Sequence, residues 1–302
     1  MRMELVRFTT TKLPESQLLL VSFAIPTFNG ERTLQKCLAS IRAQKYPNVE
    51  IVIVDGYSQD KTLEIARCFT DGVYMCNGPL GRCRQLSVEK STGHIIALFD
   101  ADIILPHPKW LYNAVMQFLT SDKNVASMEI LYLPVTGASL LSRLYLLHSN
   151  RVIKERAIRG KGSLGGGNSL FLRTRIMEAG INEHAPSTED LDLAYKLRSK
   201  GYSVIIAHEP IFHDTHVTLH EIVRKEIVRA KEFRSHGIRK LIGLTTNELL
   251  YEQLAFGLRG MILGLLKDKE PAWALFPIYL TIRIMVYGAV FLSTLVRGKA
   301  KT

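Results

Sequence analysis

Between residues 18 and 131, short apolar runs alternate with amphipathic stretches. The apolar runs predict strands over about 18–25, 49–54, 73–76, 95–99 and 125–131, and helices are expected between them over about 32–43, 60–69, 82–89 and 110–119. Strands that are apolar along their whole length are typical of sheets covered on both faces. The alternation therefore predicts an α/β fold with a mostly parallel sheet, right-handed crossovers and flanking helices.

The rest of the chain, from residue 132 onward, changes in character twice. The pattern predicts a helix over 139–159, strands over 169–172 and 204–207, a helix over 187–201, a basic amphipathic helix over 219–239 and two apolar segments over 249–266 and 273–296. We therefore expect an N-terminal extension over 1–17, an α/β domain over 18–216, a basic helical segment over 217–248 and C-terminal membrane-associated helices over 249–302. The first 17 residues contain no continuous apolar core, so no signal peptide is expected.

The two C-terminal apolar segments form a predicted helical hairpin. Each is long enough to cross a bilayer or to lie in it, but Arg259 and Arg283 interrupt them, and a buried arginine is costly in hydrocarbon. Interfacial helices, a spanning hairpin with its arginines facing inward, and a soluble hairpin packed on the domain all remain open. The trailing Arg297, Lys299 and Lys301 favour a cytoplasmic C-terminus.

Composition narrows the class of partner. The formal net charge of +11 points to an anionic partner, which could be nucleic acid, phospholipid or a phosphorylated substrate. The four cysteines contain no C-x-x-C pair, so we expect reduced thiols in a cytosolic domain rather than a metal knuckle or a redox motif.

Polar side chains follow several of the predicted strands. Asp100 and Asp102 come after the apolar run 95–99, and Asn29 and Asp55 follow the first two strands. Open α/β sheets bind ligands at the carboxyl ends of their strands, so these side chains should line one rim. Two aspartates spaced i, i+2 can converge on Mg²⁺ or Mn²⁺. A turn or a helix cap is the alternative for a bare Asp-x-Asp.

Further candidates lie later in the chain. Three glycines before Asn168 would permit close approach to a ligand, although a flexible loop is the alternative. Glu189 and Asp190 open a helix, where capping would also explain them. His213 and His216 follow the strand 204–207, and either could reach a cation held by Asp102.

Taken in order over residues 19–216, these motifs resemble the family two inverting glycosyltransferases with a GT-A fold. The stretch 22–29 (SFAIPTFN) is similar to the family's opening strand and Pro-x-x-Asn turn, and 53–62 (IVDGYSQDKT) is similar to its Val-Asp-Asp/Gly-Gly-Ser-x-Asp-x-Thr loop. Residues 99–102 (FDAD) match its Asp-x-Asp and residues 188–190 (TED) its Glu-Asp motif. Arg84 matches an arginine that the family usually follows with Asn, where this chain has Gln85.

The sequence also departs from the family pattern. Tyr57 replaces the usual small residue of the second loop, which would alter contacts with a nucleobase. No Gln-x-x-Arg-Trp follows the Glu-Asp motif, which argues against a processive polysaccharide synthase.

The resemblance implies a role for each matched residue. Asp102, with His213 or His216, would hold Mg²⁺ or Mn²⁺, and Asp190 would be the general base. The implied donor-binding residues are Pro26, Asn29, Asp55, Arg84, Asp100 and Ala101, and the implied acceptor-side residues are Gly167, Asn168 and Glu189.

The predicted function is that of a metal-dependent inverting glycosyltransferase of cell envelope glycan biosynthesis. It would use a UDP- or GDP-sugar and a lipid-linked, polyprenyl-phosphate or saccharide acceptor at the cytoplasmic face of the cell membrane, and nucleic acid is not expected as a partner. One alternative is a nucleotidyltransferase, although its usual Gly-rich, basic first loop is missing after Ile25. The other is a non-catalytic basic protein on the same fold that binds membrane or nucleic acid.

Overall fold

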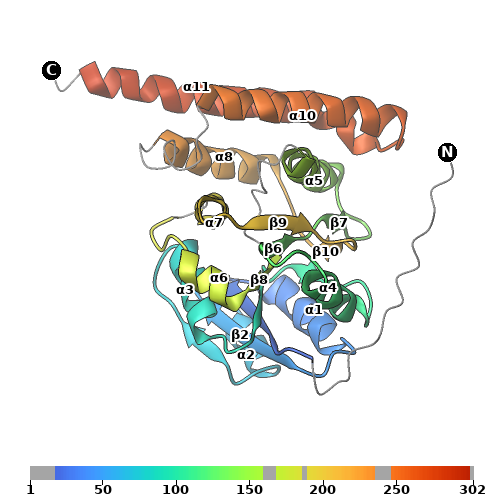
Figure 1. Cartoon of the computed structure of the whole chain (residues 1–302). Helices are drawn as coiled ribbons and strands as arrows, with labels where there is room; N and C mark the ends of the chain where they lie inside the picture. The colour runs from blue at the N-terminus through green and yellow to red at the C-terminus, as the bar shows by residue number, and fades with distance from the viewer. Residues whose placement is uncertain (1–17, 159–167, 186–188, 235–245, 300–302) are drawn as a thin grey trace.

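The computed structural model describes residues 18–158, 168–185, 189–234 and 246–299 (Figure 1). Its strands are β1 (Val21–Thr27), β2 (Val49–Asp55), β3 (Val73–Met75), β4 (Ile95–Leu98), β5 (Ile103–Ile104), β6 (Val125–Glu129), β7 (Tyr132–Pro134), β8 (Ser169–Leu172), β9 (Ser203–Ile206) and β10 (Ile211–His213). Its helices are α1 (Glu31–Arg42), α2 (Thr62–Arg67), α3 (Leu80–Lys90), α4 (Trp110–Leu119), α5 (Leu140–Ile158), α6 (Arg173–Ala179), α7 (Glu189–Ser199), α8 (Leu219–Arg234), α10 (Thr246–Leu266) and α11 (Phe276–Lys299), with the 3-10 helix η2 (Pro271–Leu275) before α11.

Within the described residues the main sheet has seven strands in the order β3-β2-β1-β4-β8-β6-β9. The strand β1 pairs in parallel with both β2 and β4, so the three carboxyl ends lie at one edge. The mostly parallel sheet predicted from the sequence is confirmed, with β8 as the exception because it runs antiparallel to β4 and β6. This antiparallel strand starts at the edge where β4 ends, which brings Asn168 beside Asp100.

The first strand extends two residues beyond its expected end. Pro26 lacks an N–H, yet it stays in β1 opposite Val54 of β2. Pairing of β1 with β4 ends at Ala24, whose carbonyl accepts the Phe99 N–H. The missing donor of Pro26 therefore points to the side of β1 where the β4 ladder has already ended.

Alternate residues of β1 face two different helical layers. Phe23 and Ile25 pack into the core shared with α1 and α4, and Ala24 packs into the core shared with α3, α6 and α7. Because helices cover both faces, every position of the strand is buried, including the polar Ser22 and Thr27. The rim at the strand ends lies between these layers.

A second, three-stranded sheet in the order β5-β10-β7 was not predicted from the sequence. Its strands have only two or three residues, too few to show a periodicity. Its pairing places His213 opposite Ile103, directly after Asp102.

The C-terminal helices form a layer at one end of the molecule. Figure 1 shows α10 and α11 side by side, with α5 and α8 between them and the sheets. Helix α11 packs on α8, and α10 packs on α5. The predicted apolar hairpin is thus confirmed. In the described part of the chain, one helical segment, Pro271–Ser293, is long and apolar enough to cross a membrane, and Leu254–Leu266 is a shorter apolar helix.

Candidate functional site

The loops that follow β1 and β2 are joined through Asp55. Its carboxylate accepts the Thr27 hydroxyl at 2.9 Å and the Ser58 N–H at 2.8 Å, and the residue is fully buried. Asp55 therefore holds the shape of the second loop, and direct contact with a nucleobase would require this loop to open.

Asn29 completes the link between the two loops. Its N–H donates to the Ser58 hydroxyl at 2.8 Å, and its side-chain oxygen accepts the Gln59 N–H at 2.9 Å. Asn29 and Tyr57 both have a positive φ, 48° and 65°, a conformation that is uncommon outside glycine and is found most often near functional sites. The aromatic side chains of Phe28 and Tyr57 remain exposed beside this strained turn.

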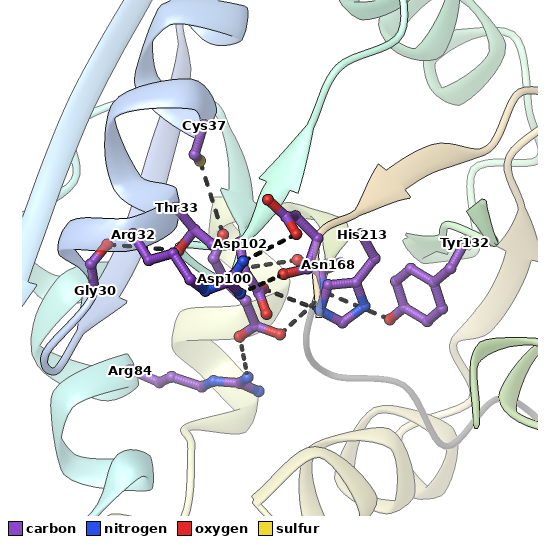
Figure 2. A network of polar contacts seen from close by, with 11 residues as sticks. Gly30, Arg32, Thr33, Cys37, Arg84, Asp100, Asp102, Tyr132, Asn168 and His213 are labelled. Atoms are coloured by element: carbon purple, nitrogen blue, oxygen red, sulfur yellow. Dashed lines mark hydrogen bonds and ion pairs between the residues drawn. The ribbon is translucent and has the colours of Figure 1, made fainter. Parts of the chain in front are cut away.

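Asp100, just beyond β4, is held from two sides. Arg84 on α3 approaches one carboxylate oxygen at 2.7 Å, and the Asn168 amide donates to the other at 3.0 Å (Figure 2). The Asp100 N–H donates back to the Asn168 side chain at 2.8 Å. Arg84 is buried, so it faces the acids of the site and not the solvated helix surface.

Glu189 and Asp190 begin α7 on the other side of Arg84. The Arg84 guanidinium contacts Glu189 at 2.9 Å. Glu189 is therefore engaged in an ion pair, and Asp190, which follows it in the chain, is the candidate for proton transfer. Burial and the Glu189 charge raise the pKa of Asp190 to about 7, although Arg84 opposes the shift. A carboxyl group with such a pKa can accept a proton near neutral pH.

Asp102 lies opposite His213 on β10. Their side chains meet at 2.9 Å between Oδ1 and Nε2 (Figure 2). Burial alone would raise the pKa of Asp102 and lower that of His213, but attraction within the pair reverses both shifts, so the pKa of Asp102 is lowered and that of His213 is raised. The attraction within the pair thus favours the ionised form of Asp102 and the protonated form of His213.

Asp100, Asp102 and His213 offer ligand atoms that all lie within 4.8 Å of one another. Carboxylate oxygens suit Mg²⁺ and Mn²⁺, and imidazole is a further ligand once it is neutral. Both carboxylates keep about 30% of their surface exposed, 32% for Asp100 and 29% for Asp102, so they are open to a ligand. These residues fit a divalent cation.

The structure separates the two candidate histidines. The side chain of His216 is 70% exposed, and its nearest acid is Asp214 at 4.0 Å. His216 therefore does not join the group formed by Asp100, Asp102 and His213, because β10 ends at His213 and the chain turns away. Ala101 sits half-buried between the two aspartates. Gly167 and Thr188 lie outside the described residues.

A salt bridge between Arg32 and Asp214, which was not predicted from the sequence, supports the segment around Asp102. Arg32 on α1 binds the Asp214 carboxylate at 3.0 Å and its carbonyl at 2.7 Å. The Asp214 N–H in turn donates to the Asp102 carbonyl at 2.7 Å. The two partners are 182 residues apart, so no local pattern marks the pair.

Known proteins that are similar to this chain are glycosyltransferases. The family model described as glycosyl transferase family 2 matches residues 22–168. The glycosyltransferase AglE of Haloferax volcanii is 29% identical over 207 residues, which cover 65% of this chain and 67% of that protein. The chain aligns with less than half the length of three further curated glycosyltransferases.

Two solved structures share the fold. The mannosyltransferase PcManGT of Pyrobaculum calidifontis, in complex with GDP-Man and Mn²⁺, has a TM-score of 0.56 at 18% identity, covering 90% of this chain and 88% of that one. Glucosyl-3-phosphoglycerate synthase of Mycobacterium tuberculosis, with Mn²⁺ and UDP-glucose, also has a TM-score of 0.56, at 17% identity, covering 76% and 81%. At these identities the likeness shows the fold alone, which is GT-A.

Proposed function

The chain belongs to glycosyl transferase family 2, and from this premise we propose that it is a metal-dependent, inverting enzyme that acts on a lipid-linked acceptor at a membrane surface. The observation that carries the proposal is the convergence of Asp100, Asp102 and His213 at the strand ends. Arg84 links this group to Glu189, the neighbour of Asp190. The family assignment replaces the nucleotidyltransferase and non-catalytic alternatives.

We assign the divalent cation to Asp102, with Asp100 and His213 beside it. When bound, Mg²⁺ or Mn²⁺ would neutralise the charge that develops on the diphosphate leaving group. Arg84 and Asn168 keep Asp100 in position, and Arg32 keeps the β10 end against Asp102 through Asp214. These contacts fix the acids before any ligand arrives, which is the condition for electrostatic stabilisation without reorganisation.

The donor nucleoside would lie along the loops after β1 and β2. Pro26, Asn29 and Asp55 shape these loops, and the exposed rings of Phe28 and Tyr57 offer flat apolar surfaces for a base or a sugar. The diphosphate would then reach Asp102. Solved relatives of the fold were crystallised with GDP-Man, UDP-Glc and UDP-GlcNAc, which makes these three the donors to test first.

Asp190 would take the proton from the acceptor hydroxyl as that oxygen attacks the anomeric carbon. The pKa of about 7 allows this near neutral pH, and Glu189, fixed by Arg84, sustains the raised pKa through its charge. Asn168, expected on the acceptor side, is buried against Asp100 and would act by holding that carboxylate. In-line attack from the side opposite the diphosphate inverts the anomeric configuration.

Membrane attachment would come from the outer face of α10 and α11. Along α11 the buried positions are Phe276, Tyr279, Arg283 and Tyr287, a single helical stripe that faces the protein. The opposite faces carry exposed large side chains, which are Tyr251, Leu258, Ile262, Leu263, Leu265, Leu266, Ile278, Ile284, Met285, Phe291 and Leu292. An apolar face of this extent is typical of a membrane or protein contact.

The inward contacts favour a hairpin that lies in the membrane surface over one that crosses the bilayer. Arg283 of α11 pairs with Glu226 of α8 at 3.1 Å, and Arg259 of α10 pairs with Glu155 of α5 at 3.4 Å. A spanning hairpin with these contacts would carry the charged helices α5 and α8 into hydrocarbon, at a high cost. In-plane binding keeps the charges in the protein and leaves the domain at the cytoplasmic face.

A transfer assay tests this function. Purified protein is incubated with radiolabelled GDP-Man, UDP-Glc or UDP-GlcNAc and a lipid extract, with and without Mn²⁺. The proposal expects label in the lipid fraction from at least one donor, only with the metal, and none with Asp102→Asn. Metal-independent transfer, or label that enters water-soluble products alone, would overturn it.

A further inference from the structure

Helix α8 brings cationic side chains to the side of the site that faces the hairpin. Lys225 and Arg229 lie one turn apart on α8, and both approach Tyr145 of α5. The Lys225 ammonium lies 5.2 Å from the centre of the Tyr145 ring, and Arg229 donates to the Tyr145 hydroxyl at 3.3 Å. The three side chains, here called the α8 cation cluster, belong to neither the metal group nor the donor loops.

The cluster carries more positive than negative charge. Glu226 accepts Arg229 at 3.1 Å and also Arg283 of α11 at 3.1 Å, so one buried carboxylate faces two guanidinium groups. Lys225 adds a third cation and makes no ion pair with any residue that the structure describes. Glu221, one turn earlier, lies near Lys225 but accepts bonds from Thr218. An uncompensated cation in a partly buried place favours an anionic ligand.

The cluster acts on both halves of the catalytic site. The Lys225 charge contributes to the lowered pKa of Asp102, after the larger effects of burial and His213. The Arg229 charge opposes the raised pKa of Asp190. Helix α5, which carries Tyr145, packs on β7, and β7 pairs with β10, the strand that ends at His213. The cluster therefore lies on the side of the metal group that faces the hairpin (Figure 1).

An apolar cavity lies on the hairpin side of the α8 cation cluster. It has a volume of about 290 Å³ and lies between α5, α10 and α11. Its apolar lining includes Leu254, Phe276, Leu280 and Ile284, and Arg283 lines it as well. Arg283 also binds Glu226, the carboxylate that Arg229 contacts, so these ion pairs connect the cavity to the α8 cation cluster.

We propose that Lys225 and Arg229, with Tyr145, bind the phosphate of a lipid-linked saccharide acceptor and thereby hold its sugar hydroxyl at Asp190. The proposal rests on the proposed function and adds the residues that recognise the acceptor. The cations lie at the boundary between the polar site and an apolar layer, which is where the phosphate of a lipid resides when its chain enters that layer. A soluble phosphorylated acceptor would use the same cations but not the cavity.

Binding measurements with three probes test the assignment. Farnesyl phosphate carries the phosphate and a lipid chain, farnesol carries the chain alone, and 3-phosphoglycerate carries a phosphate without a chain. With UDP or GDP and Mn²⁺ present, the wild type should bind farnesyl phosphate at least about tenfold more tightly than either of the others, since a charge-assisted contact and a buried chain each contribute about a factor of ten or more.

Lys225→Gln and Arg229→Gln should each weaken farnesyl phosphate binding about tenfold. Arg229→Lys keeps the charge and should recover part of the loss, which separates a charge effect from misfolding. Arg224→Gln is the matched control, because Arg224 is the exposed neighbour of Lys225 on the same helix and should leave binding unchanged.

Three results would overturn the proposal, and the first two would leave the proposed function intact. Equal binding of farnesol and farnesyl phosphate would remove the phosphate from the argument. A weaker Kd for the nucleotide sugar with Mn²⁺ in Lys225→Gln and Arg229→Gln, of the same size as the loss for farnesyl phosphate, would assign the cations to the donor diphosphate. Tight binding of 3-phosphoglycerate would assign the site to a soluble acceptor.

Discussion

Two buried arginines, Arg84 in the strand-end site and Arg283 under the hairpin, sit in opposite surroundings. Arg84 is 5% exposed and contacts two carboxylates, Asp100 and Glu189. Arg283 is 7% exposed and shares the single carboxylate of Glu226 with a second arginine, Arg229. Among the ion pairs between the described residues, one arginine faces two carboxylates in the first region, and one carboxylate faces two arginines in the second.

The difference tells which ligand each region is built to receive. Buried charge is costly unless it is paired, so an excess of one sign in a folded protein indicates a partner of the other sign. At the strand ends this partner is a cation, proposed to be the metal that accompanies the nucleotide sugar. Beneath the hairpin it is an anion, proposed to be the acceptor phosphate.

The largest expected effect is on the acid-rich side. Asp190→Asn removes the proposed proton acceptor, and kcat should fall about a thousandfold, within the usual range for loss of a general base. In the wild type, kcat/KM should rise with pH through about 7, the pKa of Asp190, and the variant should lose this rise. Steady-state transfer assays across pH 5–9 would measure both. A residual activity within about tenfold of wild type would remove Asp190 from the chemistry.

The raised pKa of Asp190 also predicts how the stability of the fold changes with pH. The pKa of Asp190 is raised from 3.8 to about 7 in the folded state, so the folded state binds a proton more tightly than the unfolded state does. Stability from this group is present below about pH 4 and is lost as the pH rises through about 7. Thermal unfolding should therefore show Asp190→Asn to be more stable than wild type at pH 8 and little different at pH 4. An Asn variant that is less stable at pH 8 would contradict the raised pKa.

The next effect is on folding, through Arg84→Met. This change leaves the buried Glu189 and the partly exposed Asp100 without their shared cation and should cost about 3 kcal/mol in the free energy of unfolding, mostly through Glu189. The loss should shrink as the pH is lowered and the carboxyl groups take up protons, or when Mn²⁺ is added. Urea unfolding at pH 8 and pH 5 would measure it. A loss that does not depend on pH would mean that packing, and not charge, explains the role of Arg84.

The same substitution at the other arginine should cost less. Arg283→Met leaves Glu226 paired with Arg229, so this buried carboxylate keeps a cation, and the cost in the free energy of unfolding should be smaller than that of Arg84→Met. Parallel urea unfolding of the two Met variants compares them directly. Equal losses would break the contrast between the two regions.

The sequence predicted the first of these regions better than the second. The buried strands before Asp55 and Asp100 are long apolar runs, so their ends, and the acids placed there, can be located from periodicity alone. The burial of Arg84 could not be foreseen, because α3 is only weakly amphipathic and its inward face is decided by contacts with Asp100 and Glu189, which lie far along the chain.

The choice between the two histidines depended on tertiary structure. His213 reaches Asp102 because β10 pairs with β5, and a strand of three residues leaves no readable period. For the second region a sequence signal did exist. Ile222, Glu226 and Ala230 are all buried on one stripe of α8, so Glu226 stands as an acid on an apolar face. An acid in such a place indicates a buried cation, which the structure supplies as Arg229 and Arg283.

The most direct test of the central claim is the metal dependence of donor binding. The midpoint of thermal unfolding is measured with GDP-Man, UDP-Glc or UDP-GlcNAc, with and without Mn²⁺, for wild type and Asp102→Asn. The account predicts that one nucleotide sugar raises the midpoint of the wild type only when Mn²⁺ is present, and that Asp102→Asn folds but loses this rise. An equal rise without the metal, or an undiminished rise in Asp102→Asn, would contradict the assignment of the strand-end acids to a cation that holds the donor.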